Sequence, residues 1–405
     1  MKRYEFKLHW QILLALVLAI LFGVYFKEYI GYVEWMGTVF LRALKMIIVP
    51  LILSSVISGV ANLVGAENLG RLGLKTIGYY LMTTTLALLV GLVFVNILKP
   101  GVGADINLAA EVDMDITPDT LGNTLINIIP DNLFSSFSDN SQMLSVIFFS
   151  ILFGFFITRV KDKYQQPLKD FFNAVFEVMM KVTMYIIKFT PFGIFGLVAS
   201  KIAEQDDLGA LMSSMGLYMI TVLAALSVHM FITLPLIVRI IGKSNPYKHF
   251  RSMQTPLITA FSTSSSGATL PLTMDAMENK AGVPKNISSF TLPLGATINM
   301  DGTALYECVA AIFIAQAYGI DLDIIQQIIV VITGLLASIG AAAVPMAGLV
   351  MISIILSVVG LPLEGIGLIL AVDRILDMFR TATNVWSDTC GAVVIAKSEK
   401  ENVNY

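Results

Sequence analysis

The chain alternates long uncharged apolar runs with short charged connections. Residues 46–66, 76–98 and 208–238 contain no Asp, Glu, Lys or Arg. An apolar run of about 18 residues or more can cross a bilayer as a helix, so each run predicts a membrane span. The run from Ile324 to Leu363 is also uncharged, but it is too long for one span and short for two. The pattern therefore predicts an all-α polytopic membrane protein.

Charges in the connections predict the orientation of the spans. Lys and Arg gather at the N-terminus and in residues 71–75, 159–169 and 239–251, whereas acidic residues dominate 99–140. Because short basic loops stay on the cytoplasmic side, we expect cytoplasmic N- and C-termini and six helices before about residue 240. No small-residue cleavage site follows the apolar stretch from Trp10 to Phe26, which predicts a retained first span.

Two later segments are interrupted at their centres by small residues. The interruptions are Ser262–Thr269 and Gly334–Gly348, and each precedes a long segment with polar positions, 286–320 and 365–396. Small side chains allow the close backbone approach and the unwinding that two half-helices need where they meet. Broken segments at corresponding places in two halves are typical of a transporter binding site. Two ordinary buried hairpins are the alternative.

Composition narrows the class of protein. The 405 residues are 56% hydrophobic and 14% charged, too little charge to cover a soluble surface, and the net charge of -3 argues against a nucleic-acid partner. Cys308 and Cys390 lie in apolar segments without metal-ligand spacing, which favours small packed side chains. His229 lies inside an apolar run, and a packed or helix-bonded histidine is favoured there over a proton relay.

The final apolar segment carries a stripe of polar residues. At about 100° per residue its members fall within an arc of roughly 80°: Asp373, Asp377, Arg380, Asn384 and Asp388, with Arg374 outside the arc. Three carboxylates against one guanidinium leave a negative excess that is too costly to bury unless cations bind or carboxylates are protonated. The Arg380 fork suits a substrate carboxylate, and Asp377 can accept from an ammonium group. Asp388 and Asn384 are oxygen donors for a hard cation.

The preceding polar segment holds Asn299, Asp301, Thr303 and Glu307. A continuous helix would place Asn299, Thr303 and Glu307 on one face and would point Asp301 away from them. Farther upstream, three hydroxyls follow helical spacing, and hydroxyls so placed usually bond to their own helix. They are Tyr80, Thr83 and Thr84.

These residues resemble one family of membrane proteins. Asn299-Met300-Asp301-Gly302-Thr303 reproduces the NMDGT motif of the dicarboxylate/amino acid:cation symporters, which include the animal excitatory amino acid transporters and the archaeal aspartate transporters. The serine-rich tip Ser264-Ser265-Ser266-Gly267 and the stripe of the final segment are similar to that family as well. The resemblance covers essentially the whole chain and rests on three motifs in the same order.

The resemblance implies an elevator-type fold. It comprises eight transmembrane helices and two re-entrant helical hairpins with inverted repeats, assembled as a homotrimer in the cell (inner or plasma) membrane. Residues 1–72 and 120–205 would form mainly the scaffold and trimerisation helices 1, 2, 4 and 5. The transport domain would take mainly residues 73–100 and 206–405, with helices 3 and 6, hairpin 1 at 247–280, helix 7 at 286–320, hairpin 2 at 323–361 and helix 8 at 362–398.

The same resemblance implies a substrate site, three sodium sites and a proton carrier. Substrate would contact the hairpin tips and the polar helices at Ser264, Ser265, Ser266, Thr303, Val344, Asp377, Arg380, Thr381 and Asn384. The sodium sites would be Gly295, Asn299, Asn384 and Asp388; carbonyls near Thr297, Ser338, Ile339 and Ala341; and Tyr80, Thr83, Thr84, Asn299 and Asp301. Glu307 would carry a proton.

The chain departs from the family pattern at several positions. Glu307 resembles the animal members, whereas archaeal members carry glutamine. Met378 stands where animal members have a second arginine, and Ser264 where archaeal members have one, so Arg374 is a candidate for the missing charge near the tip. Ala343 and Met346 stand where the second hairpin tip of archaeal members has glycines. Because glycines ease the closing motion of that tip, these two replacements affect how it closes.

The sequence therefore predicts a secondary active symporter, not an enzyme, that takes up glutamate or aspartate with Na⁺ and, as a second coupling ion, H⁺. A proton-coupled glutamate symporter without sodium and a C4-dicarboxylate carrier remain open. Succinate has no amine, so a C4-dicarboxylate carrier would have no use for Asp377. A channel would also bury charge, but the broken hairpins favour a carrier. An enzyme would need a nucleophile–base pair or metal spacing, and neither is found in the sequence.

Overall fold

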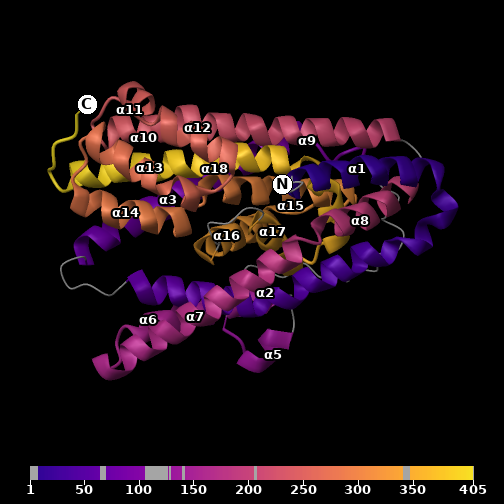
Figure 1. The fold of residues 1–405 in the computed structure, drawn as a ribbon, viewed down its shortest axis with the longest axis horizontal. Helices are drawn as coiled ribbons and strands as arrows, with labels where there is room; N and C mark the ends of the chain where they lie inside the picture. The colour runs from indigo at the N-terminus through magenta and orange to yellow at the C-terminus, as the bar shows by residue number, and fades with distance from the viewer. Residues whose placement is uncertain are drawn as a thin grey trace, which may run out of the picture.

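The computed structural model describes residues 8–63, 70–104, 126, 129–138, 142–204, 208–340 and 347–404, and the elements within these ranges are helices, with no strand among them (Figure 1). They are α1 (Leu8–Tyr25), η1 (Lys27–Tyr32), α2 (Glu34–Leu63), α3 (Gly70–Leu98), α5 (Leu133–Ser138), α6 (Met143–Ile157), α7 (Asp162–Ile187), α8 (Thr190–Glu204), α9 (Leu208–Val228), η3 (His229–Thr233), α10 (Leu234–Ile240), α11 (Pro246–Ser252), α12 (Gln254–Thr263), α13 (Ser266–Asn279), α14 (Lys285–Ile298), α15 (Asp301–Ala317), α16 (Ile324–Gly340), α17 (Ala347–Val358), η4 (Leu363–Gly365) and α18 (Ile366–Ser398).

Four helical stretches in the described ranges are long and apolar enough to cross a membrane. They are Glu34–Asn62, Arg71–Leu98, Gly209–Ile240 and Lys285–Ala317. Helices α7 and α8 would together form a fifth span, although they are bent by 52° where they meet, a bend that the sequence did not predict. These stretches support the class of polytopic membrane protein.

The second half of the chain is organised around α15 and α18. Helix α15 contacts α3, α9, α16, α17 and α18, and each of its residues except Gln316 is buried. Helix α18 in turn contacts α10, α12, α13 and α14. The polar positions of these two helices therefore lie inside protein rather than against lipid.

The end of α18 is tied to the start of α3. The Glu399 carboxylate accepts a hydrogen bond from Lys75 Nζ at 2.6 Å and another from Arg71. These two hydrogen bonds hold the pKa of Glu399 below its ordinary value. Since the Arg71 side chain is exposed, its ion pair contributes little to stability, but the two ion pairs fix which ends of the two helices meet.

The predicted interruption over Ser262–Thr269 is confirmed. Helix α12 ends at Thr263 and α13 begins at Ser266. Between them Ser264 has φ of +51°, in the left-handed region that turns the chain, and the Ser265 hydroxyl accepts from the backbone nitrogen of Ala268 to cap α13. In the second interrupted segment α16 ends at Gly340 and α17 begins at Ala347, and the residues between them lie outside the described part of the chain.

The prediction of one continuous helix over 286–320 is wrong. Helix α14 ends at Ile298, α15 begins at Asp301, and Asn299 between them has φ of −91° and ψ of 82°. The Asn299 side chain is bonded to Thr83 of α3 and Asp388 of α18, and a continuous helix would rotate it away from both. The break also frees backbone carbonyls at the end of α14, since the last turn of a helix lacks intrahelical partners.

The first half of the chain packs around the long helix α2. Helix α2 lies against α6, α7 and α8, and α1 lies along α8 (Figure 1). Glycines allow α2 and α8 to approach closely. A Cβ atom at Gly196 of α8 would lie 2.5 Å from the backbone nitrogen of Gly37 in α2, where nothing can move aside without shifting a helix.

Replacing Gly196 by Leu should lower the melting temperature of the detergent-purified protein, because overpacking typically costs about 1–3 kcal/mol. Gly216→Leu in α9 is the matched control, since a Cβ there would meet nothing within 4 Å. Equal melting temperatures of the two variants, measured by thermal unfolding in the same detergent, would contradict the close α2–α8 contact.

Candidate functional site

The Asp301 carboxylate, at the start of α15, is held by donors from three different helices. The Thr84 hydroxyl of α3 donates to Oδ1 at 2.6 Å. On Oδ2, the Ser387 hydroxyl of α18 donates at 2.6 Å and His229 Nε2 of η3 lies at 3.1 Å. Asp301 and His229 are both fully buried. At this carboxylate, α3, η3 and α18 thus meet the start of α15.

Asn299 joins the same cluster. Its Oδ1 accepts from the Thr83 hydroxyl at 3.3 Å, and its Nδ2 donates to Ser387 Oγ at 3.0 Å and to Asp388 Oδ1 at 2.9 Å. The expectation that Asp301 points away from Asn299 is therefore wrong, because both side chains meet at Ser387. The reason is the helix break, which turns the chain between them. We call this group the Asp301 cluster; its members are Thr83, Thr84, His229, Asn299, Asp301, Ser387 and Asp388.

The three upstream hydroxyls do more than bond to their own helix. Thr83 keeps one such bond, to the Tyr80 carbonyl at 3.2 Å, but also reaches Asn299. Thr84 reaches Asp301, and the Tyr80 hydroxyl donates to the carbonyl of Thr291 in α14 at 2.7 Å. The expectation that these three hydroxyls bond only to their own helix is therefore wrong, because acceptors on neighbouring helices lie within reach.

Gly295 lies where α14 approaches α18 most closely. A Cβ atom there would be 2.4 Å from Asp388 Oδ1 and 2.6 Å from the Tyr80 hydroxyl oxygen. Only glycine leaves room for these two oxygens beside the α14 backbone. The structure therefore brings together oxygen donors from α3, α14 and α18 around Asp388.

Asn384 connects the start of α15 to α18. Its Oδ1 accepts from the backbone nitrogen of Gly302 at 2.7 Å, and its Nδ2 donates to the Thr303 hydroxyl at 3.1 Å. Thr303 is thereby placed on the side of α15 that faces α18. Asn384 lies between the Asp301 cluster and the arginine of the stripe.

Arg380 is almost completely buried, with 1% of its side chain exposed. Its Nη2 lies 2.9 Å from Asp377 Oδ1 and 3.1 Å from Asp373 Oδ1, and its guanidinium carbon lies 3.9 Å from the centre of the Tyr306 ring. A Cβ at Gly348 of α17 would be 2.7 Å from Nη1. Within the described part of the chain, Nε and Nη1 have no hydrogen-bond partner. Two donor nitrogens, on different sides of the guanidinium, are thus left for other acceptors.

The stripe divides into two groups of different charge. Arg374, outside the predicted arc, reaches Asp377 Oδ2 at 3.3 Å. The Arg380 cluster, which we define as Asp373, Arg374, Asp377 and Arg380, therefore balances two carboxylates with two guanidiniums. The Asp301 cluster holds two carboxylates and no Lys or Arg. The predicted excess of negative charge is real, but it lies at Asp301 and Asp388 rather than along the whole stripe.

Glu307 lies two turns of α15 beyond the helix break and is fully buried. Neither of its carboxylate oxygens has a hydrogen-bond partner among the described residues. A permanent bond to a neighbouring helix, the structural alternative for this residue, is not found there. An unpartnered buried carboxylate is costly when ionised, which makes Glu307 a candidate to hold a proton.

The hairpin tips are only partly described. Ser264 and Ser266 are buried beside the capping residue Ser265, and Thr381 is buried on α18. The Ser338 hydroxyl donates to its own helix at Leu335, and the exposed Thr297 hydroxyl donates to Leu294. The prediction for this site concerns backbone carbonyls near these residues, and the helices that carry them, α14 and α16, are in contact. The remaining predictions for the second tip lie outside the described side chains: Ile339, Ala341, Ala343, Val344 and Met346.

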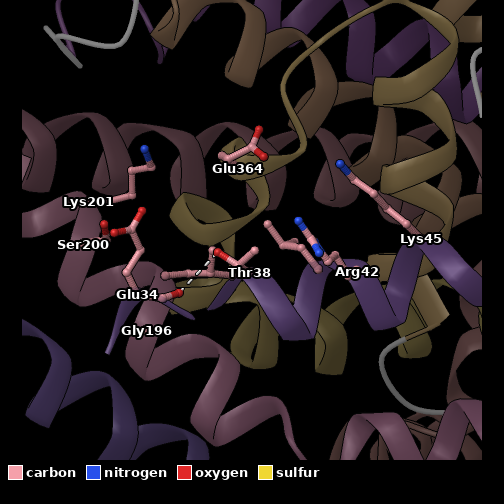
Figure 2. Close-up of a pocket in the computed structure, with 10 residues that line it drawn as sticks. Glu34, Thr38, Arg42, Lys45, Gly196, Ser200, Lys201 and Glu364 are labelled. Carbon is pink, nitrogen blue, oxygen red and sulfur yellow. Dashed lines mark hydrogen bonds between the residues drawn. The ribbon is translucent and has the colours of Figure 1, made fainter. Parts of the chain in front are cut away.

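A separate cavity of about 270 Å³ lies between α2, α8 and η4. Figure 2 shows Glu364 of η4 above Thr38 of α2, with Glu34 and Lys201 on the left and Arg42 and Lys45 on the right. No residue predicted for the site lines it. Because both charge signs are present, it lacks the negative excess of the Asp301 cluster. In the described part of the chain, no group of three or more His, Cys, Asp or Glu side chains could hold a tightly bound metal.

Sequence reasoning missed three contributors to these clusters. Ser387 bridges Asn299 and Asp301, and its place between Asn384 and Asp388 was the available signal. Tyr306 stacks on Arg380, but no spacing rule distinguishes it from a packed aromatic. His229 was recognised as buried, but its polar partner is Asp301 of another helix, not its own backbone.

Comparison with known proteins identifies the family. A sequence profile of the Sodium:dicarboxylate symporter family matches residues 8–398. Excitatory amino acid transporter 3 of Mus musculus is 39% identical over 455 residues, which cover 98% of this chain and 86% of that protein. The Proton/glutamate-aspartate symporter of Escherichia coli (strain K12) is 37% identical over 98% of this chain and 94% of its own. The Proton/sodium-glutamate symport protein of Bacillus caldotenax is 38% identical over 97% of this chain and 94% of its own length. The chain therefore belongs to the sodium:dicarboxylate symporter family.

Proposed function

We propose that the protein is a secondary active symporter that takes up glutamate or aspartate with sodium and protons by alternating access. Two of the relatives named above are a glutamate-aspartate symporter and a glutamate symport protein, and the second couples to both protons and sodium. The observation that carries the proposal is the separation of charge along α18. A buried guanidinium with two unpartnered nitrogens lies a few turns from a buried cluster with two carboxylates and no Lys or Arg.

The Arg380 cluster suits an acidic amino acid. The side-chain carboxylate of the substrate accepts from the free Nη1 of Arg380, since hydrogen bonds between a guanidinium and a carboxylate are charge-assisted and strong. Asp377 then accepts from the substrate ammonium group. Thr303, Thr381 and Asn384 surround it, and the tips close over it with Ser264, Ser265, Ser266 and Val344.

Sodium ions balance the carboxylates of the Asp301 cluster. One ion uses oxygens of Asn299, Asn384 and Asp388 and the carbonyl of Gly295. A second uses Tyr80, Thr83, Thr84, Asn299 and Asp301, and a third uses carbonyls of Thr297, Ser338, Ile339 and Ala341. Carbonyl, hydroxyl and carboxylate oxygens are the donors that hard cations prefer. The Thr84–Asp301 and Thr83–Asn299 hydrogen bonds support the second of these sites, because they join four of its proposed ligands in pairs.

Glu307 carries the proton. Its carboxylate is buried without a protein hydrogen bond in the described chain and lies one residue after Tyr306, which stacks on Arg380. A proton bound there removes the cost of a buried charge beside the substrate pocket. Protonation is thereby coupled to occupancy of the pocket.

The proposed architecture has eight transmembrane helices and two re-entrant hairpins in each subunit of a homotrimer. A scaffold (mainly 1–72 and 120–205) stays fixed in the cell membrane. A transport domain (mainly 73–100 and 206–405) slides past it, and both termini remain cytoplasmic. The contacts of α2 with α6, α7 and α8, and those of α18 with α3, α10, α12, α13, α14 and α15, support this division.

Two alternatives within the family make different use of the same residues. A C4-dicarboxylate carrier has no ammonium group to bind, so Asp377 would serve only to hold Arg380. A symporter driven by protons alone would protonate Asp301 or Asp388 instead of binding sodium. The first is tested by competition between glutamate and succinate, and the second by replacing sodium with choline.

Replacing Arg380 by Ser should abolish high-affinity binding of glutamate and aspartate. Losing one partner of a buried, charge-assisted pair costs about 2–5 kcal/mol, and serine or alanine should compete better in the variant. Equilibrium binding of radiolabelled substrate to purified protein checks this. Arg239→Ser, at an exposed position of α10, is the control and should bind normally. Unchanged acidic substrate affinity in Arg380→Ser would remove the basis of the proposal.

Replacing Glu307 by Gln should leave substrate binding intact and flatten its dependence on pH, because glutamine resembles the protonated acid but cannot titrate. Binding of glutamate across a range of pH values at saturating sodium measures the effect. If the pH profile of Glu307→Gln matches that of the unmodified protein, Glu307 is structural and sodium alone drives uptake.

A further inference from the structure

His229 makes its polar contact with Asp301 from an irregular segment of its helix. The stretch His229–Thr233 is a single turn of π-helix between α9 and α10. Such turns are rare within α-helices and frequently occur at functional sites. The same turn places the Met230 carbonyl where Trp386 Nε1 of α18 donates to it at 2.9 Å. Two contacts from one irregular turn therefore fix η3 against α18 beside Ser387.

The histidine ring has one polar partner in the described chain. Nε2 lies 3.1 Å from Asp301 Oδ2, while Nδ1 has no hydrogen-bond partner there. The ring is fully buried, so water does not compete for the contact. Because a carboxylate only accepts hydrogen bonds, we assign the proton to Nε2. Within the described chain, the one hydrogen bond of this buried imidazole is therefore the one it donates to Asp301.

Counting donors shows what this bond does to Asp301. A carboxylate oxygen accepts about two hydrogen bonds. Oδ2 receives both of its donors, from Ser387 and His229, whereas Oδ1 receives only Thr84. Oδ1 is also the oxygen on the side of α3, where Thr83 and Asn299 gather. The two donors on Oδ2 thus leave the remaining lone pair of Asp301 on the α3 side.

We propose that His229 is a positioning residue for a coupling ion: with Ser387 it saturates Oδ2 of Asp301 and presents Oδ1 to a sodium ion bound beside α3. This inference rests on the proposed function, because it assigns the ion to the second sodium site described above. His229 itself does not touch the ion. Its contribution is to fix the orientation of the carboxylate before the ion binds, which reduces the cost of ordering the site.

The role predicts a specific pattern among substitutions. His229→Leu removes the donor and keeps an apolar side chain, so Asp301 is free to rotate. His229→Gln retains an N–H donor at about the distance of Nε2 and should restore the orientation. Ser387→Ala removes the other donor to Oδ2 and should resemble His229→Leu. His249→Gln is the matched control, since His249 is a buried histidine that stacks on Trp386 and bonds to the Thr389 hydroxyl.

The experiment measures binding of radiolabelled glutamate to each purified full-length variant as a function of sodium chloride, with choline chloride holding ionic strength constant. For His229→Leu we expect the half-saturating sodium concentration to rise by about tenfold, the size typical of a lost hydrogen bond to a charged group. Glutamate affinity at saturating sodium should stay close to that of the unmodified protein. His229→Gln and His249→Gln should need nearly the normal sodium concentration.

Two results would overturn the inference. One is an unchanged sodium requirement in His229→Leu while the unmodified protein is sodium-dependent. The other is an equal defect in the Leu and Gln variants, which would mean that the ring only packs. If His229→Leu does not fold, a normal sodium requirement in Ser387→Ala overturns the inference as well. Sodium-independent binding by the unmodified protein is a different outcome, because it contradicts sodium coupling itself.

Discussion

Two buried carboxylates in one polar cluster, Asp301 and Asp388, impose the constraint on which the rest of the structure depends. Their partners are hydroxyls, an amide and an imidazole, and no Lys or Arg contacts them in the described chain. Burying an uncompensated charge costs several kcal/mol even after the protein relaxes. A mobile cation or a proton must therefore complete the site, and a site that needs an ion to be stable couples that ion to whatever else the domain binds.

The local irregularities of the fold follow from this constraint. The helix break at Asn299 turns two neighbouring side chains toward Ser387, and Gly295 leaves room for oxygens beside the α14 backbone. Asn384 then links the start of α15 to α18, between the Asp301 cluster and Arg380. Since Asn384 takes part in both the substrate and the ion proposals, it offers a direct physical route for coupling. Any such coupling is reciprocal: substrate tightens sodium binding as much as sodium tightens substrate binding.

The sequence was informative where one helix carried the signal. The stripe on α18 and the small-residue interruption at Ser264 follow from helical period and side-chain size, and both are present in the structure. Contacts between helices were not predictable in this way. Periodicity assumes a continuous helix, so it placed Asp301 on the wrong side of the break. Periodicity also predicted that Thr84 and His229 bond within their own helices. Both instead bond to Asp301, which is more than 70 residues from His229 and more than 200 residues from Thr84 in the sequence. The count of charges along the α18 stripe was incomplete for the same reason, since Arg374 lies outside the arc but pairs with Asp377.

Uptake into proteoliposomes, with sodium and proton gradients imposed separately, tests most directly whether sodium balances the Asp301 cluster. The account predicts that an inward sodium gradient drives accumulation of glutamate or aspartate at equal pH on both sides. It also predicts that replacing sodium by choline on both sides abolishes accumulation even when a proton gradient is present. Accumulation driven by the proton gradient alone, with choline in place of sodium, would contradict it.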